Sequence, residues 1–463
     1  MSELPPGWAE MRLGDSLRAL LDFRGRTPKK IGMSWGGGDI PALSALNVRL
    51  NSIDLSRTTH FGSNALYERW MTTGDPQRGD IVLTMEAPLG NVAQIPDDRR
   101  YILSQRVVLL KVQPGIDPTF VAHQMRAPDF RADLLGRATG TTATGISQKR
   151  LVEVDLRVAP LPEQKRIADK LDALLARVDA CRDRLDRVPG ILKRFRLSVL
   201  AAATSGDLTR DWREDDTERA PGRLPETWIE VKTKDVGRVQ LGRQRAPKFH
   251  SGHSMRPYLR VQNVFEDRLD LSDVMEMDFP GEDIERFELH VGDILLNEGQ
   301  SPQFLGRPAM YRGELPGACF TNTLIRFQAN ERVNPYFALL VFRRHMHSGR
   351  YMDEGTITTN IAHLGAGRFG NVEFPLPPLR EQAEIARRCD VLMTYASDAE
   401  TRVAAVSRSI DRLTPSTLTK AFRGDLVPQD PNDEPATVLL AQILGGRRES
   451  EGRFRPARNI SMR

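Results

Sequence analysis

The chain has 463 residues, a net charge of +5 at neutral pH and a pI near 9.1. This length predicts two to four domains, each able to bury a core of its own. No apolar run reaches the roughly 18 residues of a membrane span, and the first residues lack the features of a secretory signal, so no membrane partner is expected. The positive charge permits a polyanionic partner without establishing one.

Three isolated cysteines, Cys181, Cys319 and Cys389, lie far apart in the sequence. Their spacing matches neither a disulfide scaffold nor a zinc site. We therefore expect a cytoplasmic protein with reduced thiols and without a bound metal.

Residues 1–158 form the first predicted domain. Short apolar runs at 81–83 and 107–110 are typical of strands, and a helical pattern follows at 119–135. Clusters of Gly, Pro, Asn and Asp separate these runs. The pattern predicts a compact α+β domain.

Residues 159–209 are predicted to form a long helical spacer. Apolar or small residues recur there in alternating steps of four and three, which is a heptad seam; its members are Ile167, Leu171, Leu174, Val178, Cys181, Leu185, Val188, Leu192, Phe195, Val199 and Ala202. Pro189 is expected to kink or break this helix. About 40 residues at ~1.5 Å each would make a rod of roughly 60 Å.

Residues 210–376 are interpreted as a charged linker followed by a second α+β domain, with strands at 294–296 and 324–327 and a helix at 335–347. A second helical spacer is predicted at 377–426. Its looser seam includes Ile385, Cys389, Val406, Ile410 and Leu413, and Pro415 interrupts it. The tail at 427–463 contains one short helical run at 436–444 and is expected to be disordered at its basic end.

The two halves of the chain are copies of each other. Residues 160–208 recur at 378–426 without a gap, and about a third of the aligned pairs are identical, far above chance for ordinary composition. The domains match more loosely, for example Asn47 and Asp54 with Asn263 and Asp270. A long period of this kind indicates two copies of a whole domain with its connector. It predicts a pseudo-two-fold molecule whose two helices pack antiparallel.

Sequence motifs for catalysis are missing. The chain contains no P-loop, no H-E-x-x-H, no G-x-S-x-G and no G-x-G-x-x-G motif. Residues 334–337 are similar to the base-binding motif of amino-methyltransferases but lack its second proline and any methyl-donor loop. We expect a non-catalytic protein that binds no cofactor.

Basic, amide and hydroxyl side chains recur at corresponding places in the two domains. Such groups neutralise phosphates and read base edges. In the first domain the candidates are Arg24, Arg26, Lys29, Lys30, Thr141, Thr142, Thr144, Gln148, Lys149 and Arg150. In the second they are Arg243, Arg245, Lys248, Asn297, Gln300, Asn322, Thr358, Thr359 and Asn360. No single cluster distinguishes a DNA contact from a solvated loop, so their recurrence is the stronger argument.

The two helical regions resemble a known family. Residues 160–168, 191–196 and 206–208 are similar to the first conserved region of the specificity (S) subunit of type I restriction–modification enzymes, and residues 377–385 and 420–426 to the second. The resemblance implies two target recognition domains, each reading half of a bipartite double-stranded DNA target, with the helices setting the spacing. It implies two modification (M) subunits and restriction (R) subunits as partners, which would use S-adenosylmethionine, ATP and Mg for adenine methylation and cleavage.

Three alternatives remain open from the sequence. The chain could be a coiled-coil adaptor that binds proteins, which would show no salt-dependent DNA binding. It could serve a modification-only or other phage-defence system. A self-contained enzyme is the least favoured, because the motifs are missing.

Overall fold

The computed structural model describes residues 4–140, 144–213, 222–358 and 361–450. They divide into two compact units, residues 1–184 with 406–463, and residues 185–405. The division crosses both long helices, so each unit contains one mixed domain and about half of each helix. Mixed helix and strand content confirms the predicted α+β class, while the predicted domain limits stay a prediction.

The first domain is built around two small sheets. One has the order β2-β8-β5-β6 with antiparallel neighbours, and the other has the order β4-β3-β7. Their bounds are β2 Leu17–Asp22, β3 Ile40–Leu43, β4 Phe61–Gly62, β5 Ile81–Thr84, β6 Val92–Gln94, β7 Ile102–Leu103 and β8 Val107–Val112. Strand β8 is buried on both faces because Val108 and Leu110 join one core while Val107 and Leu109 join the other. This accounts for the continuous apolar run in the sequence.

The second domain repeats this topology. Its sheets have the orders β11-β20-β16-β18 and β15-β12-β19. Their bounds are β11 Gly237–Leu241, β12 Met255–Leu259, β15 Met275–Asp278, β16 Ile294–Asn297, β18 Pro308–Met310, β19 Cys319–Phe320 and β20 Leu324–Ala329. Strand β16 alternates between two cores in the same way, with Ile294 and Leu296 in one and Leu295 in the other. The duplication therefore includes the folds of the domains.

Apart from α5 (Leu161–Ser205) and α10 (Leu379–Ala421), the helices are short, and the longest of them are α7 and α11. The helices of the first unit are α1 Asn64–Trp70, α2 Pro118–Arg126, α3 Pro128–Gly136, α4 Gln148–Leu151 and α11 Ala436–Ser450. Those of the second are α6 Asp283–Phe287, α7 Pro335–Ser348, α8 Arg350–Glu354 and α9 Ala366–Asn371. The predicted helix at 119–135 is two helices because Pro128 disfavours a helical conformation at Ala127, where the chain is extended.

One motif joins each domain to its long helix. Strand β1 (Ala9–Arg12) pairs with β9 (Asp155–Val158), and β10 (Ile229–Lys232) pairs with β23 (Glu373–Leu376), just before helices α5 (Leu161–Ser205) and α10 (Leu379–Ala421). At the start of α5, buried Glu163 accepts a hydrogen bond from Trp8 Nε1 at 3.1 Å. At the start of α10, Glu381 accepts one from Trp228 Nε1 at 2.9 Å.

The glutamine that follows each of these glutamates, Gln164 or Gln382, completes a Glu-Gln motif and binds backbone groups. Gln164 Oε1 accepts from Asp117 N at 2.9 Å, and Gln382 Oε1 accepts from Asn334 N at 2.8 Å. Asp117 and Asn334 are the N-caps of α2 and α7. The Glu-Gln pair therefore fixes each long helix to the corresponding domain, which explains why this part of the duplication is sharpest.

Both long helices run through their prolines, Pro189 in α5 and Pro415 in α10. A kink or a break was expected at these positions, and the break does not occur. A proline removes one backbone hydrogen bond, and the many remaining bonds of helices with 45 and 43 residues maintain the helix on both sides.

The two helices pack together in each unit. In the first unit Leu171 near the start of α5 shares a core with Leu418 near the end of α10, and Arg182 pairs with Asp411 at 3.2 Å. In the second, Val199 shares a core with Ile385, and Arg196 pairs with Glu400 at 2.7 Å. The order of these contacts along each helix confirms the antiparallel pair.

Fewer residues of the predicted seam are buried than a heptad pattern indicates. Cys181 is exposed, and Val406 and Leu413 are about half exposed. An α-helix of 3.6 residues per turn drifts away from a 3.5-residue repeat, so regularly spaced positions turn away from the partner helix.

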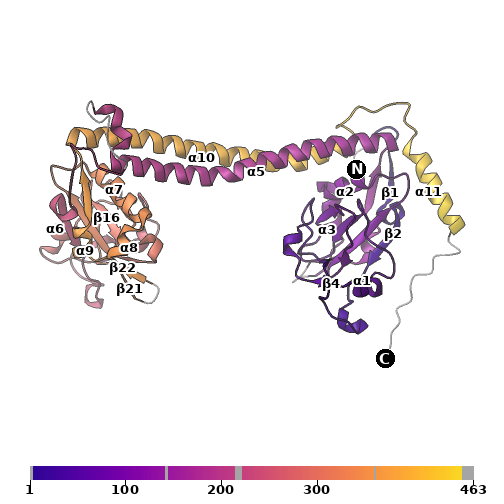
Figure 1. Ribbon diagram of the computed structural model, residues 1–463, viewed down its shortest axis with the longest axis horizontal. Coiled ribbons are helices and arrows are strands. Elements are labelled where there is room, and N and C mark those ends of the chain that lie inside the picture. The colour runs from indigo at the N-terminus through magenta and orange to yellow at the C-terminus, as the bar shows by residue number, and fades with distance from the viewer. Residues whose placement is uncertain (1–3, 141–143, 214–221, 359–360, 451–463) are drawn as a thin grey trace. The chain divides into compact units, whose positions relative to one another are not determined.

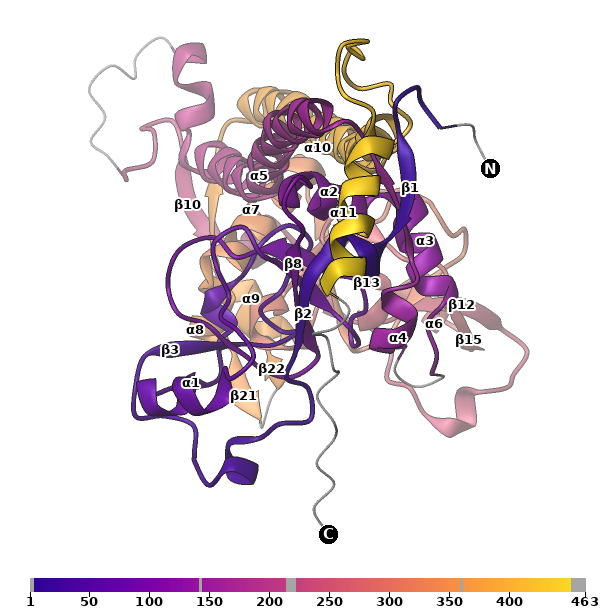
Figure 2. The ribbon, with the colours of Figure 1, turned by 90° about the vertical axis from the view of Figure 1, so that its right-hand side faces the viewer.

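Two segments outside the domains and the long helices are ordered. A 3₁₀-helix at Asp207–Trp212 spans the end of the predicted first spacer and the start of the predicted linker, and it lies on α10, where Arg388 pairs with Asp211 at 2.6 Å. Helix α11 confirms the helical run in the tail and lies along β1 (Figure 2), with Leu439, Leu440 and Ile443 against the first unit's core. Residues 451–463, at the basic end of the tail, lie outside the described residues. Within the described parts, no helix is both long and apolar enough to span a bilayer.

Candidate nucleic-acid interface

In the second domain, segments far apart in the sequence lie side by side along one edge. Asn322 N donates to Arg243 O at 3.0 Å, and Glu298 N donates to Thr323 O at 3.0 Å. Strand β17 (Gly299–Gln300) then pairs with β22 (Ile361–His363), which pairs with β21 (Thr356–Thr358). Within this unit the β21–β22 hairpin lies at the end opposite the long helices (Figure 1).

Exposed cations lie along the beginning of this edge. Arg245 lies over the Tyr258 ring at 5.6 Å and Lys248 over the Phe249 ring at 4.9 Å, and both side chains are open to solvent. Asn322 is also exposed. The aromatic rings orient these side chains while leaving their polar groups accessible.

Two other candidates of this domain are buried. The Arg243 side chain lies over the Phe249 ring at 3.7 Å and pairs with Asp283 at 3.1 Å. Asn297 is fully buried, and its Nδ2 donates to Val264 O at 3.5 Å. Asn297 Oδ1 has no hydrogen-bond partner among the described residues. Because both side chains are buried inside the domain, these residues support the edge in this structure and do not form its surface.

The remaining candidates lie at β17 and the hairpin. Gln300 is half buried, and its Oε1 accepts from Ser301 N at 3.0 Å. Thr358 belongs to β21, but its side chain is not among those described, and Thr359 and Asn360 lie outside the described residues.

The first domain places its basic cluster after β2. Arg24 pairs with Asp22 at 2.6 Å, and this hydrogen bond raises the pKa of its guanidinium. Arg26 Nη1 donates to Trp70 O at 2.6 Å. Lys30 Nζ donates to Gly25 O at 2.7 Å while remaining exposed, as Lys29 does. The two lysines are therefore the solvent-exposed cations of this cluster, and the two arginines are bound to groups of their own domain.

A hairpin in the first domain corresponds to β21–β22. Thr139 and Gly145 exchange backbone hydrogen bonds, and Gly145 also bridges to Glu86 after β5. Thr144 on this hairpin is exposed, whereas Thr141 and Thr142 lie outside the described residues.

Helix α4 follows the hairpin at once and presents Gln148, Lys149 and Arg150 to solvent. Ser147 caps it by accepting from Arg150 N, and Arg150 Nη1 donates to Arg137 O at 3.0 Å. Three consecutive polar side chains on a capped turn form an exposed basic site beside the hairpin.

Sequence reasoning missed Arg106, which lies on the same edge. Its backbone has a positive φ of 66°, its O accepts from Met85 N at 2.8 Å, and its side chain pairs with Glu86 at 3.3 Å while half exposed. It stands where Thr323 stands in the second domain. A basic residue immediately before the predicted strand at 107–110 was the available signal.

The two edges expose the same kinds of chemical group. Their exposed groups are lysine and arginine cations, amides and hydroxyls, which contact phosphates and base edges. Among the residues the structure describes, no cluster of three or more histidine, cysteine or acidic side chains could hold a metal ion.

Comparison with known proteins identifies the fold and the family. The family model described as "Type I restriction modification DNA specificity domain" matches twice, at residues 5–188 and 225–404. The chain is 26% identical to the StySPI specificity subunit of Salmonella potsdam, over 97% of this chain and 98% of that protein. It is 29% identical to the EcoBI specificity subunit of Escherichia coli, over 76% and 77%.

Solved structures agree with this fold. The HsdS subunit from Thermoanaerobacter tengcongensis superposes with a TM-score of 0.60 at 19% identity, covering 92% of this chain and 99% of that one. A chain from a structure concerned with assembly and conformational transition of the type I R-M system gives 0.63 at 19% identity, over 92% and 100%. The two family matches coincide with the two copies of the domain and its helix, and the chain therefore belongs to the specificity subunits of type I restriction–modification enzymes.

Proposed function

We propose that the chain is the DNA-reading subunit of a type I restriction–modification complex, and that each domain reads one half of a bipartite target. The observation that carries this proposal is the repeated domain–helix junction, in which Glu163 and Gln164, and Glu381 and Gln382, make the same contacts. Two copies of one reader, each fixed to a long helix, suit a target with two related parts.

The divergence of the two edges supports separate readers. The open side chains of the first edge are Lys29, Lys30, Thr144, Gln148, Lys149 and Arg150. Those of the second are Arg245, Lys248 and Asn322, with Gln300 half buried. Because the frames agree and these surface groups differ, the two halves of the target would differ in sequence.

The helical pair would set the distance between the two half-sites. Two readers reach equivalent grooves of a duplex when their sites lie about one helical turn, ~34 Å, apart. The antiparallel contacts of α5 with α10 in each unit fit this role, since they hold both helices in register.

Chemistry would belong to partner subunits. Two modification subunits would dock on the scaffold and methylate adenine with S-adenosylmethionine, and restriction subunits would supply ATP- and Mg-dependent cleavage. The exposed apolar side chains of the long helices, among them Ile191, Val391 and Tyr395, offer them contact area. The chain itself would bind no cofactor, and the complex would act in the cytoplasm.

The test is co-expression with the modification subunit from the same genome, followed by mapping of N6-methyladenine in the host DNA. The proposal predicts a split motif with a constant gap. A variant with alanine at Arg245, Lys248 and Asn322 should lose specificity in one half-site only. A soluble, assembled complex that methylates no motif would contradict the proposal.

A further inference from the structure

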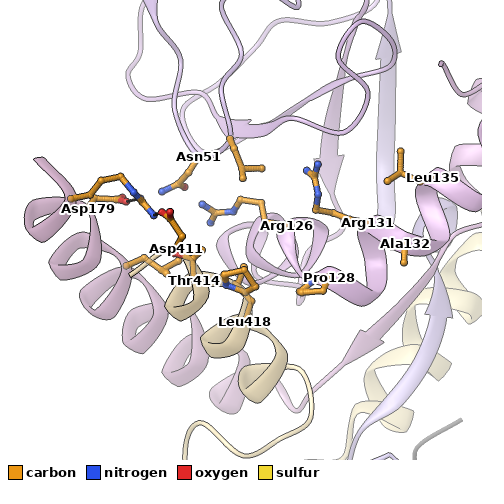
Figure 3. A pocket seen from close by; sticks show the side chains of 14 residues that line it. Asn51, Arg126, Pro128, Arg131, Ala132, Leu135, Asp179, Asp411, Thr414 and Leu418 are labelled. Carbon is orange, nitrogen blue, oxygen red and sulfur yellow. Dashed lines mark hydrogen bonds and ion pairs between the residues drawn. The ribbon is translucent and has the colours of Figure 1, made fainter. Parts of the chain in front are cut away.

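A cavity of about 610 Å³ lies in the first unit, between α2 and α3, the loop at Leu50 and the two long helices (Figure 3). Its lining is largely apolar, with Leu50, Leu135, Leu175, Pro415 and Leu418 among the contributors. A concave, mostly apolar site of this size with a few polar groups is typical of small-molecule binding.

The most deeply buried polar side chain of the cavity is Arg126, with a relative exposure of 7%. Its Nε donates to Ala122 O at 3.1 Å, and its Nη2 donates to His123 Nδ1 at 2.5 Å. The guanidinium points into the space beside Asn51 (Figure 3). Within the part of the chain that the structure describes, no carboxylate lies within ion-pair distance of it.

The neighbouring histidine leaves this charge unneutralised. His123 Nδ1 accepts from Arg126, so its Nε2 carries the proton and donates to Asp172 at 2.7 Å. Burial lowers the pKa of His123, and it lowers the pKa of Arg126 to about 10, although Asp172 and Asp179 partly offset the effect on Arg126. A buried cation without a paired anion is costly.

The second copy shows which group satisfies this arginine. Arg343 holds the position of Arg126, since each follows its N-cap, Asn334 or Asp117, by nine residues. Arg343 Nε donates to Glu266 at 2.9 Å and lies 3.7 Å from Asp267. Burial alone would raise the pKa of Glu266, but His347 and Arg343 lower it to about 2. This arginine is fully paired with carboxylates from its own domain.

The first copy lacks these two acids. Glu266 and Asp267 follow Asn263, and Leu50 and Asn51 follow Asn47 at the same spacing. Asn47 and Asn263 make the same turn, donating to Asp54 O and Asp270 O, and both Asn51 and Asp267 have positive φ. The backbones therefore agree, and a leucine and an asparagine stand where the second copy has a glutamate and an aspartate.

From this difference we infer that the cavity at Arg126 binds a small carboxylic acid with an apolar body, whose carboxylate takes the place that Glu266 holds in the second copy. Arg126 would bind the carboxylate, with Asn51 as a further hydrogen-bond partner, and the leucines would cover the apolar body. Asp179 and Asp411 on the rim both pair with Arg182, so these charges offset one another. The apolar part of the lining favours a ligand with an apolar body over a small hydrophilic dianion such as phosphate. The inference does not depend on the proposed function.

Isothermal titration calorimetry of the full-length chain tests the inference. The probes are octanoate, its neutral analogue octanamide, and inorganic phosphate. Octanoate should bind at one site per chain, and Arg126→Met should weaken its binding about tenfold or more because a charge-assisted hydrogen bond is removed. Octanamide, which lacks the charge, should bind the parent chain about as weakly as octanoate binds the Arg126→Met variant.

A second variant separates ligand binding from folding. Leu50→Glu with Asn51→Asp transplants the acids of the second copy and keeps Arg126. It should raise the unfolding temperature of the chain without ligand and abolish octanoate binding. The inference is overturned if octanoate does not bind the parent, if Arg126→Met binds it equally well, if phosphate binds as tightly, or if the transplanted acids lower the unfolding temperature.

Discussion

Replacement of Gln382 tests whether the Glu-Gln motif fixes the second domain to its helix. This side chain is fully buried. Its Oε1 accepts from Asn334 N at 2.8 Å, and its Nε2 donates to Arg332 O and Pro377 O, both at 2.9 Å. Gln382→Met keeps the length of the side chain and removes all three hydrogen bonds.

The expected cost follows from these hydrogen bonds. Each contributes about 1 kcal/mol net, and a buried partner left unsatisfied costs about 1–3 kcal/mol. Because Arg332 is exposed and its carbonyl can bind water, we expect a loss of about 3 kcal/mol in the free energy of unfolding. Gln164→Met removes two bonds, to Asp117 N and Ala159 O, and should cost about 2 kcal/mol.

Urea unfolding combined with amide hydrogen exchange measures both size and place. Gln382→Met should accelerate exchange in α7 and the start of α10, and Gln164→Met should do so in α2 and the start of α5. Exposed Arg380 provides a control, whose replacement by alanine should change stability by less than about 0.5 kcal/mol. Losses below 1 kcal/mol in both glutamine variants, or faster exchange in the same segments for both, would refute the reasoning.

Three further predictions concern charges. Glu266→Gln should destabilise the chain by about 2–3 kcal/mol at pH 7. The pKa of Glu266 is about 2 in the folded chain and 4.5 ordinarily, so this loss of stability is present above about pH 4.5 and should vanish as the pH falls towards 2. Urea titrations at several pH values measure it. Alanine at Lys149 and Arg150 should weaken DNA binding. The slope of log affinity against log salt concentration, measured by fluorescence anisotropy, should become shallower by about 0.9 for each phosphate that is no longer neutralised. An unchanged slope would exclude a role for these two cations. Arg182→Ala removes exposed pairs with Asp179 and Asp411 and should change the unfolding free energy by less than about 1 kcal/mol.

The sequence was sufficient to predict the two long helices and the central strands of each domain, but not the short helices. Strand β8 and strand β16 are buried on both faces, so their apolar runs are unbroken and easily recognised. The antiparallel helix pair followed from the duplication. A kink or a break was expected at Pro189 and Pro415; the helices do not break there because local propensity gives way to the rest of a long, packed helix.

The binding edge was predicted less completely. Composition cannot distinguish an exposed arginine from one held inside, and Arg243 is buried against Phe249 and Asp283 while Arg245, two residues later, is exposed. Arg126 had no local signal at all. Its significance depends on the contacts of Arg343 with Glu266 and Asp267, which only the structure shows, and on the different residues, Leu50 and Asn51, in the first copy.

The most direct test of the account lengthens the helical pair. Matched insertions of one to seven residues after Arg184 in α5 and after Ala405 in α10 would lengthen each helix by ~1.5 Å and turn it by ~100° per residue. The seven-residue insertion is close to two full turns, so it nearly keeps the orientation of the domains and adds roughly 10 Å, or about three base pairs at ~3.4 Å. Each variant would be co-expressed with the modification subunit and its N6-methyladenine motif mapped. The account predicts that the gap lengthens while both half-sites keep their sequences. Altered half-sites with an unchanged gap would contradict it.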